Sequence, residues 1–138
     1  MVDRARAGLF AAAAALGAVL CFHFPDLDIR LLGIRYHRYF LFHSAILPAL
    51  LLAVLHPLRR ARFAVVAACV VSAFALGVGA HLVTDVFQSK SVVFPFARTL
   101  VRGTSVDDRL WEGGNAAICG LLVWRSSRGV RSRPAGRP

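Results

Sequence analysis

Charged side chains are scarce within the long apolar runs of this sequence, and acidic ones are scarce throughout it. The 138 residues include seven Asp and Glu against 17 Lys and Arg, and 57% of them are hydrophobic. The apolar residues come in blocks rather than alternating with polar ones, which excludes an ordinary soluble domain. The net charge of +10 lies mostly at block ends and in the C-terminal tail. It is therefore typical of membrane-flanking segments, and we expect no nucleic-acid partner.

Cysteine is also sparse. The three cysteines, Cys21, Cys69 and Cys119, each fall in a different apolar block, and no CxxC spacing occurs. An odd number of separated cysteines does not make a closed disulfide framework. We interpret them as small apolar side chains within helices and assign them no function.

Four apolar blocks predict the fold. They lie at about 7–24, 39–56, 63–83 and 110–124, and the third is the clearest. Because a spanning helix needs about 20 apolar residues, we predict an all-α polytopic membrane protein with about four transmembrane helices. The first block also fits a signal peptide, although it lacks a small-residue cleavage site in a polar segment. Residues 1–125 would form one helical membrane domain, and residues 126–138 a basic disordered tail.

The distribution of basic residues predicts the orientation. With four spans and the N-terminus inside, ten of the 17 basic residues lie inside: Arg4, Arg6, Arg59, Arg60, Arg62 and the five arginines from Arg125 onward. The positive-inside rule then favours a cytoplasmic N-terminus and a cytoplasmic C-terminus. The many Arg and Ala residues beside a single Lys suggest a GC-rich bacterial genome, and hence the bacterial inner membrane.

Two polar stretches interrupt the apolar chain, at residues 25–44 (PDLDIRLLGIRYHRYFLFHS) and at residues 81–85 (HLVTD). Their candidate metal ligands are Asp26, Asp28, His37, His43, His81 and Asp85. The first span would end, the second begin and the third end on the same side of the membrane, so the two stretches are expected to meet there. His81 and Asp85 are four residues apart and would share one helical face.

Mixed His and Asp ligands suit a divalent metal ion, and zinc or manganese is expected here. A metal open to water activates that water as a nucleophile near neutral pH. Six candidates exceed the three or four ligands of one zinc, so either two metals bind or some residues act as acid, base or outer support. We assign catalytic roles to His37, Arg38 and Asp85, in which His37 or a carboxylate moves protons and Arg38 binds a substrate anion.

Each residue also has an interpretation without chemistry. Asp26 and Asp28 fit a solvated turn and helix cap, and His37 with Arg38 fits an interfacial basic pair. Arg38 could equally neutralise the aspartates. Asp85, near a helix C-terminus, would need a metal or a basic side chain beside it. Three outer residues are candidate neighbours of the site: His23 is near enough in sequence to reach it, and Glu112 and Asn115 are expected in its wall.

The order of these motifs resembles a known family. The matching stretches are residues 25–28, 37–44, 79–85 and 95–96, within a resemblance that covers roughly residues 8–125. The family is the predicted membrane-bound metal-dependent hydrolases, also called the LexA-binding, inner membrane-associated or YdjM-like proteins. The resemblance implies metal-binding or catalytic roles for the six candidate ligands, with Arg38 and Ser44 in support. The chain departs from the pattern at Ile29, where family members often have histidine.

These observations predict a metal-dependent membrane hydrolase that acts on a lipid-like or phosphoester substrate, with membrane lipid and a divalent metal as its partners. The alternative is a non-enzymatic membrane protein with a structural His/Asp site, acting in assembly, stress response or metal sensing. A transporter is disfavoured, because the polar residues gather at one face rather than along a path across the bilayer.

Overall fold

The computed structural model describes residues 2–34, 37–57, 63–88, 92 and 108–131. Over these residues the chain forms five α-helices and no strand, which confirms the all-α prediction. The helices are α1 (Val2–Cys21), α2 (Leu27–Leu32), α3 (Ile46–Leu55), α4 (Ala64–Val86) and α5 (Asp108–Arg131).

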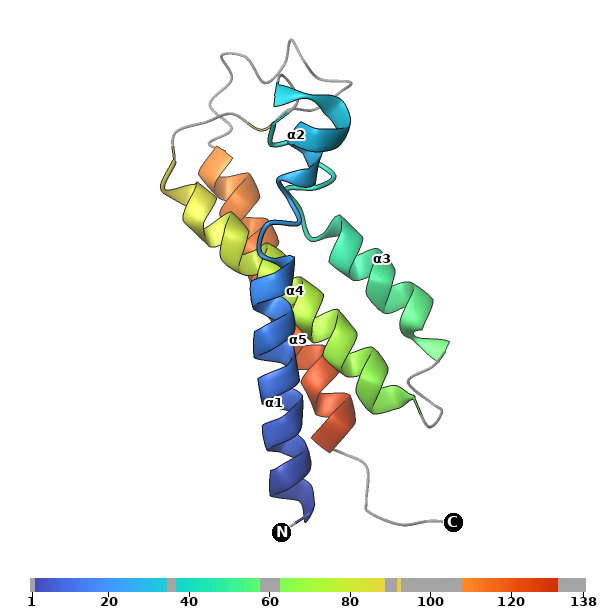
Figure 1. Cartoon of the computed structure of the whole chain (residues 1–138). Helices are drawn as coiled ribbons and strands as arrows, with labels where there is room; N and C mark the ends of the chain where they lie inside the picture. Colours follow the sequence, from blue (N-terminus) through green and yellow to red (C-terminus); the bar gives the residue numbers. More distant parts are fainter. Residues whose placement is uncertain (1, 35–36, 58–62, 89–91, 93–107, 132–138) are drawn as a thin grey trace.

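Helix α4 is the centre of the bundle (Figure 1). It packs along α5 in the antiparallel direction and along α1 in the parallel direction, and the shorter α3 contacts both α4 and α5. The buried core lies largely between α4 and α5, where Val78 and Leu82 meet Cys119. The short α2 lies beyond one end of the bundle, near the C-terminal end of α4 and the start of α5 (Figure 1). This end of the bundle holds the polar residues.

Two glycines of α4 allow its close packing on both sides. A Cβ added at Gly77 would lie 2.7 Å from the Cβ of Cys21 in α1, and one added at Gly79 would lie 3.0 Å from the Cβ of Cys119 in α5. Small residues at such positions let helix backbones approach closely. Residues two apart on a helix point in nearly opposite directions, so this pair brings a neighbour against each side of α4, close to the polar end that begins at His81.

The predicted second block is wrong in its extent. The helix there, α3, begins at Ile46 rather than near residue 39, and it has ten residues, or about 15 Å of length. Pro48 accounts for the late start. It has no N–H to donate to the carbonyl four residues earlier, and its ring crowds that carbonyl. It is therefore tolerated in the first turn of the helix, where no such donor is needed.

Helix α5 is longer than the predicted fourth block. It has 24 residues and ends at Arg131, so residues 126–131, which were predicted as the start of a disordered tail, are helical. The guanidinium of Arg128 lies 4.3 Å from the ring centroid of Trp124. Such a cation–π contact one turn apart stabilises the last turns of the helix. Residues 132–138 lie outside the described residues.

The helices differ in how well they fit a membrane. Of the described helices, α4 is long and apolar enough to cross a bilayer, whereas the apolar part of α1 (Ala7–Cys21) and α3 are shorter. The part of the chain that the structure describes therefore contains one candidate membrane-spanning helix. The first predicted block also shifts, because α1 runs from Val2 to Cys21 rather than over residues 7–24.

Candidate metal centre

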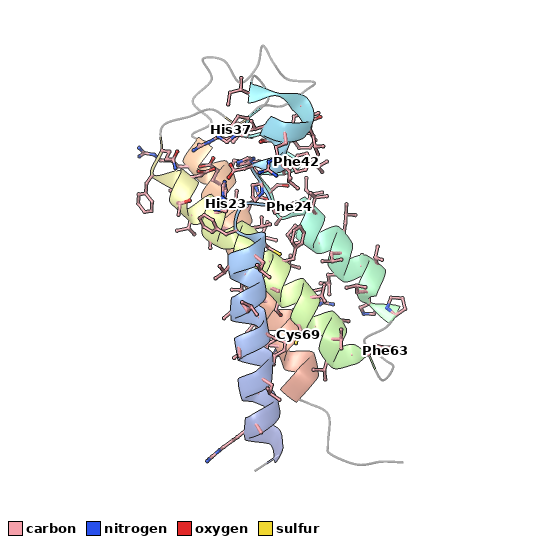
Figure 2. The ribbon with its side chains drawn as sticks, viewed as in Figure 1. His23, Phe24, His37, Phe42, Phe63 and Cys69 are labelled. Carbon is pink, nitrogen blue, oxygen red and sulfur yellow. The ribbon has the colours of Figure 1, made fainter. Side chains whose placement is uncertain are left out.

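The two polar stretches of the sequence come together at one end of the bundle. Figure 2 shows His23 and His37 at this end and Phe63 at the opposite one. The cluster is built by α2 and the turn before it, by the segment 37–45, and by the ends of α4 and α5 that face them. All six predicted ligands lie in it: Asp26, Asp28, His37, His43, His81 and Asp85.

His43 is fully buried at the middle of the cluster. Its Nδ1 is 3.2 Å from Oδ2 of Asp28, and its Nε2 is 3.4 Å from Oδ2 of Asp85. The Nε2 of His81 is also 3.4 Å from that same Asp85 oxygen. His43, His81 and Asp85 are all buried and each offer a ligand atom within 4.8 Å of the other two. These three residues could therefore hold a metal ion.

A second group forms the outer side of the cluster. Asp26 and His37 are half-buried, and with His43 they again offer three ligand atoms within 4.8 Å of one another. One carboxylate oxygen of Asp26 is 3.7 Å from Nε2 of His81, and the other is 3.3 Å from Nδ1 of the exposed His23. Because His43 belongs to both groups, the predicted ligands form one continuous site that is closed on the inside and partly open at its rim.

Asp28 organises the centre from α2. Its side chain is fully buried, and its Oδ2 accepts a hydrogen bond of 2.9 Å from the backbone N–H of Tyr39. Its other oxygen is 3.5 Å from Nδ1 of His37. Since Oδ2 also faces His43, this carboxylate fixes the backbone of the segment 37–45 and the orientation of both imidazoles. A carboxylate beside an imidazole nitrogen is the usual means of fixing the tautomer and angle of a metal-binding histidine.

Several buried atoms of the cluster lack a well-aligned hydrogen bond. Within the described part of the chain, both ring nitrogens of His43 and of His81 have no such partner, and neither does Oδ2 of Asp85. Their mutual approaches are close, but they are not aligned as hydrogen bonds. A buried polar atom left unsatisfied costs about 1–3 kcal/mol. A cation shared by the facing lone pairs would satisfy them, so the donor set fits a metal ion.

Among the described residues, the buried charges of the cluster are unbalanced. Asp28, Asp85 and Glu112 are three buried carboxylates there, and Arg38 is the buried cation among them. With neutral imidazoles this leaves two negative charges in a water-poor region, where unpaired charge is costly. One divalent cation, or two protonated imidazoles, would balance them.

Arg38 is turned toward carboxylates rather than toward solvent. It is 1% exposed; its Nη2 is 3.1 Å from Oδ1 of Asp85, and its Nη1 is 2.9 Å from Oε1 of Glu112. Nη1 also faces the backbone carbonyl of Gln88 at 3.4 Å. Its backbone has φ = +63°, a left-handed conformation that is uncommon for a residue other than glycine and that tends to occur at functional sites. Of the two roles predicted for Arg38, this geometry corresponds to neutralising carboxylates, those of Asp85 and Glu112.

The backbone of the segment 37–45 is held by side chains of α5. Trp111 donates its indole N–H to the carbonyl of His43 at 2.8 Å, and the amide oxygen of Asn115 accepts the N–H of Ala45 at 2.9 Å. Ser44, predicted as a supporting residue, donates to the carbonyl of Leu41 and accepts from the N–H of Ile46. These bonds pair the carbonyls of Leu41 and His43 and the N–H groups of Ala45 and Ile46, which have no helical partner of their own.

The contribution of α5 to the site is larger than the sequence predicts. Glu112 and Asn115 are predicted only as wall residues, and no role in the site is predicted for Trp111 or for Gln88 at the end of α4. The available signal was a carboxylate and an amide close together at the start of an apolar block, on the same side as the other polar residues. The matching stretch at residues 95–96 lies outside the described residues.

Comparison with family models, curated proteins and solved structures gives no match for this chain.

Proposed function

We propose that this protein is a membrane-embedded hydrolase that binds a divalent metal ion at His43, His81 and Asp85. The observation that carries the proposal is the set of buried ring nitrogens and the Asp85 oxygen that face one another without aligned hydrogen bonds. The excess of buried carboxylates supports it, because a divalent cation would balance the charge. The resemblance of the same residues to the membrane-bound metal-dependent hydrolases supports it as well.

The ligand types favour zinc or manganese, since both accept mixed imidazole and carboxylate ligands. When bound, such an ion supplies Lewis acidity and activates water near neutral pH. His37 and Asp26 lie at the partly open rim, where they can exchange protons with solvent and meet an incoming substrate. We propose His37 as the residue that moves the proton, and a phosphoester or lipid-like ester as the substrate class.

We further propose that the bundle is embedded in the bacterial inner membrane through the apolar surfaces of four helices, α1, α3, α4 and α5, of which α4 is long and apolar enough to cross it. Large apolar side chains point outward from all four, as expected of surfaces that face lipid. Those most exposed on each helix include Leu9, Leu20, Val54, Val66, Val83, Leu110 and Leu121. The excess of arginine at the predicted inner ends favours cytoplasmic termini.

A reporter fused after Pro138 is expected to be active only as a cytoplasmic reporter. The physical reason is the positive-inside bias of the arginines. The measurement pairs a reporter that works in the cytoplasm with one that works outside, fused at the same position. An active external reporter would refute the proposed orientation.

A non-enzymatic metal site is the second candidate function. The observation that favours it is the complete or nearly complete burial of His43, His81 and Asp85, because structural metal sites are closed, whereas catalytic sites keep an open position. The partly exposed Asp26 and His37 favour the hydrolase.

Turnover and metal content together test the proposal. Protein purified in detergent is expected to contain stoichiometric zinc or manganese and to hydrolyse a member of a panel of phospholipids and phosphoesters. His81→Ala should lose the metal and the turnover together, because it removes an imidazole from the innermost group. Bound metal without turnover on any substrate favours the non-enzymatic candidate, and a metal-free protein under every loading condition rules out both.

A further inference from the structure

We propose that Glu112 is a positioning residue of the metal centre. By pairing with Arg38, it keeps the guanidinium from taking both oxygens of Asp85, and so leaves one of those oxygens to the two histidines. This inference rests on the proposed metal site, and it assigns to α5 a role in shaping a site whose ligands all come from other parts of the chain.

The two oxygens of Asp85 have different partners. Oδ1 is 3.1 Å from Nη2 of Arg38. Oδ2 is 3.4 Å from Nε2 of His43 and 3.4 Å from Nε2 of His81. One oxygen is therefore held by a fixed positive charge, while the other is presented between two imidazoles. Oδ2 is the oxygen that would act as the metal ligand.

The two Nη atoms of Arg38 pair with two different carboxylates, which is not the usual arrangement for an arginine. Guanidinium and carboxylate groups match in shape, and they favour a pair of parallel hydrogen bonds that uses both oxygens. Here Nη1 instead pairs with Oε1 of Glu112 at 2.9 Å, which is shorter than the contact of Nη2 with Asp85. Glu112 thus holds the half of the fork that would otherwise close on the second oxygen of Asp85.

The residues around Arg38 hold its guanidinium between Asp85 and Glu112. Glu112 is fully buried, and α5 packs tightly along α4. Gln88 adds its backbone carbonyl at 3.4 Å from Nη1 and its side-chain oxygen at 3.5 Å from Nη2. The carboxylate of Glu112 also compensates the charge of Arg38, which reduces the repulsion between the guanidinium and a cation bound at Oδ2.

The direct test is Glu112→Gln in the purified full-length protein. The amide keeps the size of the side chain but removes the charge that holds Nη1, so the fork is free to close on both oxygens of Asp85. We expect the Kd for zinc to rise about 10- to 100-fold, the range found when an outer partner of a metal ligand is removed. Glu112→Asp keeps the charge, and its Kd is expected to lie closer to that of the wild type. With cobalt in place of zinc, the visible absorption bands should shift in Glu112→Gln, because a ligand oxygen has changed its position.

A second background separates positioning from general stability. In Arg38→Lys the cation is retained, but an ammonium group has no fork to close on Asp85. If Glu112 acts through the fork, adding Glu112→Gln to Arg38→Lys should change the zinc Kd by less than about threefold, so the two effects are far from additive. Should Glu112→Gln not fold, Glu112→Asp carries the same comparison with a smaller expected rise in the zinc Kd, because its shorter side chain draws the carboxylate away from Nη1 of Arg38.

The outcomes are distinct. Wild-type affinity in Glu112→Gln, or an equal loss in both backgrounds, overturns the positioning role while the metal site stands. A wild-type protein that binds no metal overturns the proposed function and this inference together. A loss of affinity in the wild-type background that disappears in Arg38→Lys supports the inference.

Discussion

Replacing Asp85 with asparagine is expected to abolish stoichiometric zinc binding. The change keeps the shape of the side chain, but it replaces the anionic oxygen that lies between His43 and His81 with a neutral amide. The loss of affinity should exceed the roughly 100-fold that marks the upper range for outer partners of a metal ligand, because Asp85 would contact the ion itself. Zinc content after purification and a competition titration with a zinc-binding dye measure the effect.

Thr84→Val is the matched control for this change. Thr84 is next to Asp85 on the same helix, and its hydroxyl donates to the carbonyl of His81 at 2.6 Å without entering the cluster. The control should retain wild-type zinc content and affinity. Equal zinc affinity in Asp85→Asn and the wild type would mean that the metal is bound without the innermost group, and would move the site to Asp26 and His37.

Two changes at buried charges are expected to have opposite effects on the metal-free protein. Arg38→Gln removes the buried cation and leaves Asp28, Asp85 and Glu112 without it, so the free energy of unfolding should fall by about 3–5 kcal/mol. Asp28→Asn removes one of the surplus negative charges and keeps an acceptor for the N–H of Tyr39. Its metal-free form should therefore be at least as stable as the wild type. Unfolding by heat and by denaturant in detergent, after treatment with a chelator, measures both.

Zinc should reverse the order of the wild type and Asp28→Asn. A ligand at 100 times its Kd stabilises a folded protein by about 2.7 kcal/mol, and the wild type should gain an amount of this order. Asp28→Asn should gain much less, because its neutral amide no longer orients His43 as a carboxylate does. If Arg38→Gln is as stable as the wild type without metal, the carboxylates are protonated, and the charge argument for a metal ion fails.

The sequence was sufficient to predict the helical class and the meeting of His43 with His81 and Asp85. The apolar blocks predict where the helices end, and these ends place the three residues on the same side of the membrane. Polar side chains are also easy to recognise as candidate ligands in a chain that is otherwise apolar. The start of α3 at Ile46 does not follow from the apolar block at about 39–56, because hydropathy does not register that Pro48 belongs in the first turn of a helix. The extension of α5 depends on local contacts such as that of Arg128 with Trp124, which hydropathy does not register.

The pairing of Arg38 with Glu112 could not be predicted in the same way. These residues are 74 positions apart, and no periodicity links a turn after α2 to the first turns of α5. Their contact depends on how α5 lies along α4, which is set by packing details such as Gly79 against Cys119. From the sequence, a substrate anion or the aspartates are the possible partners of Arg38. The packing of α5 along α4 brings a further carboxylate, that of Glu112, to the guanidinium.

The position of His81 within α4 has a consequence for how water reaches the site. If α4 is centred in a bilayer, His81 lies about 9 Å from the midplane at 1.5 Å per residue, within a hydrocarbon layer of about 30 Å. At that depth lipid provides no hydrogen-bond partner for an unpaired peptide group. The hydrogen bonds from Trp111 and Asn115 therefore allow the non-helical backbone of the segment 37–45 to lie there. Among the six candidate ligands, Asp26 and His37 are the partly exposed ones, so water, reactants and products would reach the buried group past these two side chains.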